Sequence, residues 1–203
     1  MSCQMNKAMT KAERTKQFII EQAAPLLMKN GIAGTAMSDI MAATRLAKGS
    51  LYVHFENKEE LSYAVVDHNL EMLGKKMLEG SNRQSSSKGK ILLLLKILGD
   101  PLNTPLEGGC PMLNFGIEAD DTNPAVLKKV AKTIKNIQQA TASLVRQGIA
   151  NGEFNKNWNA DVFATKSFAL IEGGILLSRV TGKSEQMKVI IKIIRDEIEE
   201  MSL

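Results

Sequence analysis

Two short amphipathic segments joined by a tight turn, within residues 37–55, constrain the fold of this chain more than any other feature. In the first segment Ile40 and Ala43 share one face, and in the second Leu51 and Phe55 recur at an i, i+4 spacing. Helices of this length have no stability alone, because nucleating a helix costs more than its few hydrogen bonds return. The pattern therefore predicts two short helices that are held in place by neighbouring helices.

The opposite face of the second segment carries side chains suited to contacting nucleic acid. Lys48, Ser50, Tyr52 and His54 supply a cation, hydroxyl and imidazole donors and a flat aromatic ring. A short helix that begins in this way fits the major groove of DNA, where it can read base edges and bind phosphate. Any pair of short amphipathic helices in a core would show the same periodicity, so the flanking residues decide between the two interpretations.

The flanking residues place these segments between two longer helices. Upstream, an apolar stripe predicts a long helix that ends near residues 29–31, Lys-Asn-Gly, a cation followed by residues suited to a left-handed cap. Thr35 is expected to cap the next helix, with Asp39 in its first turn. Downstream, Asn57 is expected to cap a helix from residue 58, with Glu60 reaching back as in a capping box.

The positive charge is confined to the same part of the chain. Residues 1–55 hold seven Lys or Arg against three Asp or Glu, whereas residues 56–203 hold nineteen of each. The whole net charge of +4 therefore lies in the segment with the two short helices, as phosphate binding requires.

The remainder of the chain predicts an all-α protein of about nine helices. Only 4% of residues are aromatic, 44% are hydrophobic, and no useful stretch alternates as a strand would. A nearly apolar helix over residues 90–98 is expected to be buried on all sides. Asn123 and Pro124 predict a helix start, with Asn as the cap and Pro at the first helical position. Further helices are expected at 58–80, 111–119, 158–180 and 184–201.

From about residue 11 to residue 61 the chain resembles the amino-terminal domain of TetR-family transcriptional regulators. The run KGSLYVHFENKEEL at residues 48–61 is similar to the family's recognition helix and the start of its fourth helix. Two positions depart from the family pattern: Arg45 stands where a small turn residue, often Gly, is usual, and Ala47 stands where Ser caps the helix. The run GCPMLNFGIEADDTNP at residues 109–124 is similar to a segment in the carboxy-terminal domain of one TetR subgroup.

This resemblance implies a cytoplasmic, homodimeric, ligand-responsive regulator, with repression as the usual mode of the family. Residues 1–57 would form the helix-turn-helix DNA-binding domain, and residues 58–203 the ligand-binding and dimerisation domain. The partners implied are double-stranded, palindromic operator DNA and a small apolar or amphipathic effector, which would move the helix at 58–80. The expected DNA-binding residues are Thr35, Arg45, Lys48, Gly49, Ser50, Tyr52, His54 and Lys58.

The effector is expected to lie between the helices of residues 58–180. Methionines repack around varied ligand shapes, and a few polar groups can fix one orientation. Glu118 is the expected polar anchor, together with Asn114, although the apolar candidates suit a closed core equally well. The predicted lining consists of Met72, Met77, Leu95, Met112, Asn114, Phe115, Glu118 and Phe168.

The last two helices are expected to form the dimer interface, because TetR regulators dimerise there through a four-helix bundle. The apolar stripe of the last helix is wide enough for one side to face its own domain and another a partner. The adjacent Gly173 and Gly174 would permit close approach of another backbone across a dimer interface. Alternatively, they mark a kink in the core of a monomer. The predicted interface consists of Gly173, Gly174, Ile190, Ile194 and Ile198.

Several classes of function find no support in the sequence. His54 and His68 lie fourteen residues apart on different predicted elements, so no metal site is expected. No nucleophile-and-base pair or phosphate-binding Gly-rich loop is present, so neither an enzyme nor a cofactor is expected. The two cysteines, Cys3 and Cys110, suit a reducing cytoplasm, and no membrane span is expected. Cys110 precedes a predicted helix start, so it is either a redox sensor or, more simply, a small buried residue.

One alternative belongs to a different class of protein. A helical ligand-binding or adaptor protein, whose basic end contacts protein or RNA, would share the helical pattern and the charge distribution. Salt-dependent binding to duplex DNA separates the two hypotheses.

Overall fold

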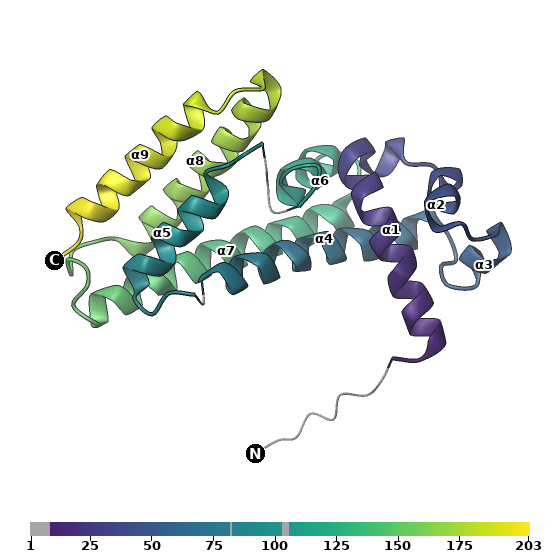
Figure 1. The fold of residues 1–203 in the computed structure, drawn as a ribbon, viewed down its shortest axis with the longest axis horizontal. Helices are drawn as coiled ribbons and strands as arrows, with labels where there is room; N and C mark the ends of the chain where they lie inside the picture. The colour runs from purple at the N-terminus through teal and green to yellow at the C-terminus, as the bar shows by residue number, and fades with distance from the viewer. Residues whose placement is uncertain (1–8, 82, 103–105) are drawn as a thin grey trace, which may run out of the picture. The chain divides into compact units, whose positions relative to one another are not determined.

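A computed structural model describes residues 9–81, 83–102 and 106–203, and within these ranges the chain forms nine helices and no strand (Figure 1). The predicted all-α fold is confirmed. Cys3 lies outside the described residues. None of the described helices combines the length and the apolar character that crossing a membrane requires. The helices are α1 (Lys11–Gly34), α2 (Met37–Thr44), α3 (Lys48–Tyr52), α4 (Lys58–Ser81), α5 (Ser87–Leu98), α6 (Pro111–Ala119), α7 (Pro124–Ala150), α8 (Ala160–Thr181) and α9 (Glu185–Glu200).

The chain divides into two compact units, one ending at His68 and the other beginning at Asn69. The division falls inside α4, so this helix contributes its first residues to the first unit and the rest to the second. The sequence pattern predicted a division ahead of this helix, between residues 57 and 58. Because α4 is continuous and contributes residues to both units, a conformational change in one unit can be transmitted to the other through this helix.

The first unit is built on α1, whose two ends are set by local chemistry. At its start Thr10 forms a capping box: Glu13 N–H donates to Thr10 Oγ1 at 3.2 Å, and Thr10 N–H donates to Glu13 Oε2 at 2.7 Å. The predicted end near residue 31 coincides with a break, since Gly31 has φ 77° and interrupts the helical geometry. Only glycine enters this left-handed region readily, so the chain turns here toward α2.

The start of α4 follows the predicted capping pattern with one difference. Glu60 N–H donates to Asn57 Oδ1 at 2.8 Å, as expected for a capping asparagine. Glu60 reaches back one residue further than predicted, and its Oε2 accepts the Glu56 N–H at 2.8 Å. This hydrogen bond, followed by that from Lys16, lowers the pKa of Glu60 below its usual value.

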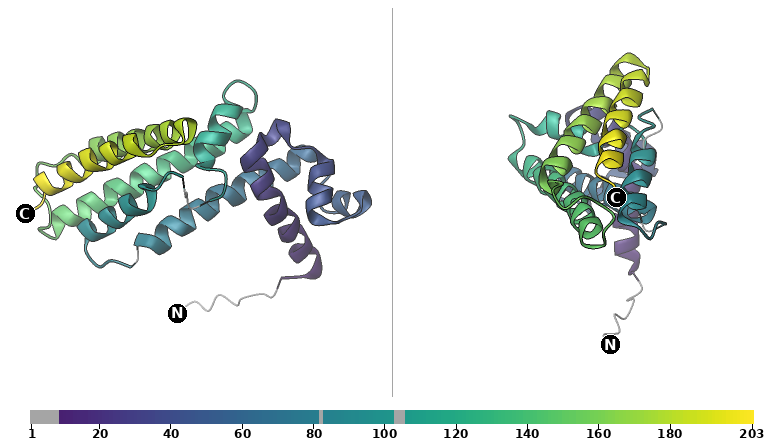
Figure 2. Two further views of the ribbon diagram at one scale, coloured as in Figure 1. Left: turned by 45° about the horizontal axis from the view of Figure 1, so that its top comes forward. Right: turned by 90° about the vertical axis from the view of Figure 1, so that its left-hand side faces the viewer.

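The second unit is organised around α7 and α8. Helix α7 packs against α5, α6 and α8, and α8 packs against α9 along its length (Figure 2). The predicted start of α7 is confirmed, because Val126 N–H donates to Asn123 Oδ1 at 3.1 Å and Pro124 occupies the first turn. The core of this unit includes Phe115, Phe154, Phe163, Met187, Ile194 and Ile198.

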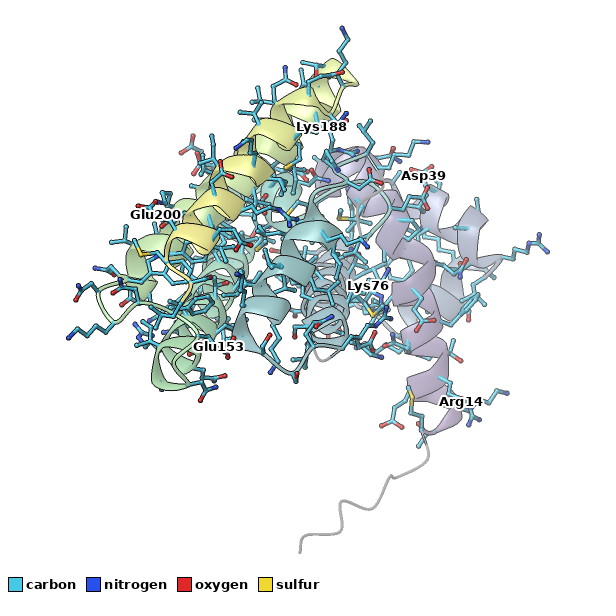
Figure 3. The ribbon with its side chains drawn as sticks, turned by 60° about the vertical axis from the view of Figure 1, so that its left-hand side comes forward. Arg14, Asp39, Lys76, Glu153, Lys188 and Glu200 are labelled. Carbon is cyan, nitrogen blue, oxygen red and sulfur yellow. The ribbon has the colours of Figure 1, made fainter. Side chains whose placement is uncertain are left out.

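Helix α5 differs from its prediction in its start and in its burial. It begins at Ser87, because Ser86 accepts the Gly89 N–H and Glu153 accepts the N–H groups of Ser87 and Lys88, each at 3.0 Å. Glu153, labelled in Figure 3, lies just after α7, far along the chain from α5. Only Ile91 and Leu95 of the apolar run are fully buried, so the expectation of burial on all sides is wrong. Packing covers one face of α5, and Lys96 is exposed.

Candidate functional site

Helices α2 and α3 form the predicted pair of short helices, joined by a turn at residues 45–47 (Figure 1). Ile40, Leu51 and Phe55 are each 1% exposed or less, which confirms the inward face expected from their spacing. Lys16 supports this face from α1, with its ammonium 4.6 Å from the centre of the Phe55 ring and 3.2 Å from Glu60 Oε1. The sequence pattern did not single out Lys16, because its partners lie about forty residues away in the chain.

Helix α3 presents Lys48, Gly49 and Tyr52 to solvent. Lys48 and Tyr52 lie on the same side of the helix, with the ammonium 5.9 Å from the centre of the Tyr52 ring, and Tyr52 is 42% exposed. Gly49 is exposed, and a Cβ at this position would meet nothing within 4 Å. Ser50 and His54 are half-buried. Packing among the described residues therefore does not account for the exposed Lys48, Gly49 and Tyr52, and an external partner explains them better.

Thr35 does not have the role predicted for it. It is fully buried, and its hydroxyl donates to the Gly31 carbonyl at 2.7 Å. The residue that precedes α2 is Ala36, whose backbone N–H donates to Asp39 Oδ2 at 2.8 Å. A hydroxyl enclosed by the end of α1 cannot reach a phosphate, so Thr35 leaves the candidate DNA-binding set. The predicted position of Asp39 in the first turn of α2 is confirmed.

Lys58 is half-buried and its ammonium donates to the Ala33 carbonyl at 3.3 Å, which ties the start of α4 to the end of α1. An ammonium has three donors, so two remain for a phosphate. Lys58 therefore stays in the candidate set, with a structural contact added to the predicted one.

The turn between α2 and α3 stores backbone strain at Arg45. This residue has φ 56° and ψ 26°, and it is the one non-glycine residue with positive φ in the described part of the chain. A side chain in the left-handed region costs roughly 1–2 kcal/mol, which explains why a small residue is usual at this position in the family that the chain resembles. Ala47 makes no side-chain cap at the start of α3, as its chemistry dictates.

Replacing Arg45 by Gly is expected to raise the melting temperature by roughly 2–4 °C, corresponding to about 1 kcal/mol of relieved strain. Arg45→Ala is the matched control, since it removes the same exposed guanidinium but keeps a Cβ in the left-handed conformation. Thermal unfolding followed by circular dichroism measures both. Equal melting temperatures for the two variants would show that the turn is not strained.

The second unit encloses a cavity of about 80 Å³ between α4, α5, α7, α8 and the start of α6. Four of the eight residues predicted to line an effector site lie on its wall: Met77, Leu95, Met112 and Phe168. Other lining residues were not predicted, because their positions are dispersed along the chain. They include Ile91, Ile137, Thr141, Phe163, Ser167 and Glu172.

The other four predicted lining residues do not border this cavity. Phe115 is fully buried elsewhere in the core, and Met72 is half-buried. Asn114 donates from its amide to the Gly108 carbonyl at 2.9 Å, so it holds the loop that precedes α6. Glu118 is half-buried near the end of α6, away from the wall. The predicted polar anchor formed by Asn114 and Glu118 is therefore wrong for this cavity.

A different acidic residue meets the cavity. Glu172, on α8, lines it together with Cys110, and the Cys110 thiol donates to Glu172 Oε1 at 3.3 Å. Burial, followed by the neighbouring carboxylate, raises the pKa of the Cys110 thiol far above its usual value. Cys110 is thus a buried neutral thiol, which supports the simpler of the two interpretations of this residue.

The predicted interface on α8 and α9 belongs largely to the chain's own core. Ile194 and Ile198 are 1% exposed or less, and a Cβ on Gly174 would lie 2.8 Å from Met187 Cε and 2.9 Å from Ile190 Cδ1. Gly174, Ile194 and Ile198 therefore belong to the chain's own core, so their assignment to an interface is wrong. Ile190 is half-buried, and a Cβ added to Gly173 would meet nothing within 4 Å, so these two predicted members stay open.

Another set of apolar side chains on the same two helices is exposed. On α8 they recur at helical spacing around Gly173, and on α9 they lie four residues apart. We call this set the α8–α9 apolar face; it consists of Val162, Leu176, Leu177, Val180, Val189 and Ile193, each at least 42% exposed.

Comparisons with known proteins agree with this architecture. The family model described as "Bacterial regulatory proteins, tetR family" matches residues 19–65, and that described as "Tetracyclin repressor-like, C-terminal domain" matches residues 95–194. A TetR transcriptional regulator from Chloroflexus aurantiacus is 35% identical, with a TM-score of 0.89, over 96% of this chain and 98% of its own. A TetR-family regulator from Cytophaga hutchinsonii is 32% identical, with a TM-score of 0.89, over 97% and 99%. The HTH-type transcriptional repressor DhaR from Mycobacterium sp. strain GP1 is 22% identical over 179 residues, 88% of this chain and 89% of its own.

Proposed function

Because the chain belongs to the tetR family of bacterial regulatory proteins, which are DNA-binding regulators and not enzymes, we propose that it is a ligand-responsive repressor. It binds palindromic operator DNA in the cytoplasm as a homodimer and leaves the DNA when a small molecule binds. Repression is supported by the name of the relative DhaR, a transcriptional repressor.

The surface of α3 is the single observation that carries the DNA-binding proposal. Lys48, Tyr52 and Gly49 are exposed on a helix whose opposite side is buried, in the part of the chain that holds all the net positive charge. Lys48 can reach base edges or phosphate, and Tyr52 and His54 can donate to phosphate. Arg45 and Lys58 add cations on either side of α3 in the sequence.

The α8–α9 apolar face supports a homodimer. Its exposed side chains cover two antiparallel helices, and in a two-fold dimer the same face meets itself as a four-helix bundle. A Cβ added to Gly173 would meet none of the described residues within 4 Å, so this position leaves space for a partner helix. A two-fold dimer presents two copies of α3, which matches a palindromic operator with half-sites in successive major grooves.

The cavity in the second unit supports control by a small molecule. Leu73 and Met77 line it from α4, and the same helix begins at Lys58, shortly after α3 in the chain. A ligand that displaces Leu73 and Met77 shifts α4 and, in the dimer, changes the spacing of the two recognition helices. The decrease in operator affinity and the ligand affinity are then thermodynamically linked.

Fluorescence anisotropy with duplex DNA from the region upstream of the protein's own gene tests this function. Affinity is expected to fall steeply with salt, with a slope of about −0.9 for each phosphate neutralised, and a scrambled duplex should bind roughly a thousandfold more weakly. The matched RNA duplex is the control for the adaptor hypothesis. Equal affinity for operator and scrambled DNA, or preference for RNA, would contradict the proposal.

A further inference from the structure

The acidic residue in the cavity has an unusual environment. Glu172 Oε1 accepts the hydrogen bond from the Cys110 thiol, while Oε2 is buried and has no hydrogen-bond partner among the described residues. A thiol is a weak donor, so even the first oxygen is poorly satisfied. A buried polar atom without a partner costs free energy and calls for an explanation. Burial accordingly raises the pKa of Glu172, and the thiol only partly opposes this effect.

The remaining wall of the cavity offers this carboxyl group no counter-charge. None of the lining residues is Lys, Arg or His, and the other polar side chains are the neutral Cys110, Thr141 and Ser167. An anionic ligand would meet a like charge with no cation to offset it. A purely apolar ligand would leave Oε2 unpaired and remove it further from water. A ligand with a protonated nitrogen supplies both the missing donor and the missing charge.

We propose that the effector is a largely apolar molecule with a single protonated amine, which enters this cavity and pairs with Glu172. This proposal rests on the proposed function, because it names the chemistry of the effector of that regulator. Ser167 and Thr141 add hydroxyls to the same cavity wall, and the apolar rest of the wall takes the apolar body of the ligand.

The size of the cavity limits the apolar body. Its volume of about 80 Å³ is smaller than the roughly 150 Å³ of an apolar cavity that holds benzene. Met77 and Met112 lie on the wall, and methionine side chains readily repack around a guest. A single ring with a short aminoalkyl arm is therefore an appropriate probe.

Four probes with the same ring isolate the role of charge: benzylamine, benzyl alcohol, toluene and benzoate. Calorimetric titration into the full chain is expected to give the tightest binding for benzylamine and none for benzoate. Glu172→Gln, which keeps the shape but not the charge, should weaken benzylamine at least roughly tenfold while leaving toluene unchanged, as for the loss of one charge-assisted hydrogen bond. Glu118→Gln, outside the cavity wall, is the control and should leave all four unchanged.

The outcomes decide two questions: whether the ligand is an amine, and whether the cavity controls DNA binding. The proposal for an amine is overturned if benzylamine does not bind, or if it binds no tighter than toluene. It is also overturned if Glu172→Gln leaves benzylamine binding unchanged. Release of operator DNA is measured with the same probes. If toluene releases the DNA and benzylamine does no better, the cavity is an effector site but the amine assignment is wrong. If benzylamine binds through Glu172 without releasing the DNA, the ligand class stands and the regulatory function of the cavity fails.

The stability of the ligand-free protein gives an independent readout. A residue kept for ligand binding at the expense of folding should, when neutralised, stabilise the empty protein. Glu172→Gln is therefore expected to raise the melting temperature by roughly 2–4 °C without ligand. A lower melting temperature would show that Glu172 is a structural residue and would overturn the proposal.

Discussion

Replacing Lys48 and Tyr52 together by alanine is expected to abolish specific operator binding while leaving the protein folded. Both side chains are exposed on α3, so removing them opens no cavity. The interaction between the ammonium and the ring contributes no more than about 1 kcal/mol at such an exposed site. Affinity should fall roughly a thousandfold, to the non-specific level, and the salt slope should decrease by about one unit for each phosphate that the variant no longer neutralises.

The matched control is Lys132→Ala, which removes one positive charge from an exposed position on α7 in the second unit. It should leave both the affinity and the salt slope near those of the wild type. Anisotropy titrations at several salt concentrations measure the binding, and circular dichroism verifies that each variant is folded. Wild-type affinity in the double variant at physiological salt would remove α3 from the DNA-binding surface.

Replacing Ile193 by Glu is expected to convert the proposed dimer to folded monomers, whereas Ile194→Glu should unfold the chain. Ile193 is 49% exposed on the α8–α9 apolar face, and Ile194 is 1% exposed in the core of the second unit. A charge at Ile193 remains in water in the monomer but would be buried twice in a two-fold dimer. A charge at Ile194 is buried in every state, at a cost comparable to the whole stability of a domain.

Sedimentation velocity measures the oligomeric state of the Ile193→Glu and Ile194→Glu variants, and thermal unfolding measures their stability. Val189→Glu, on the same face, should reproduce the behaviour of Ile193→Glu. The operator affinity of both monomeric variants should fall, because one recognition helix replaces two. A dimer that persists in both variants would place the interface elsewhere on the protein.

Local chemistry in the sequence was enough to predict the helices and several of their ends. The capping residue Asn57, the pair Asn123–Pro124 and the break at Gly31 act within a few residues of themselves, so no knowledge of the fold is needed to interpret them. The inward direction of Leu51 and Phe55 was also predictable, because a short helix has only one apolar side to bury.

The predictions that failed concern which neighbour each side chain meets. Thr35 was expected to cap α2, but its hydroxyl reaches back to Gly31, where the turn after α1 encloses it. Glu118 was expected to line the cavity as a polar anchor, but the acidic residue on the cavity wall is Glu172, whose partner Cys110 lies 62 residues away in the chain. A contact over such a separation leaves no mark in the local sequence pattern.

Helix α9 shows which features the sequence determined and which only the tertiary structure decided. Its sequence determined an amphipathic helix with an apolar stripe too wide for a single face, and this much follows from the helical period. Only the tertiary structure decided that Ile194 and Ile198 are buried while Val189 and Ile193 remain exposed. The reason is physical: the period of a helix sets the angle between side chains, but the rotation of the whole helix about its axis is set by the neighbours it packs against.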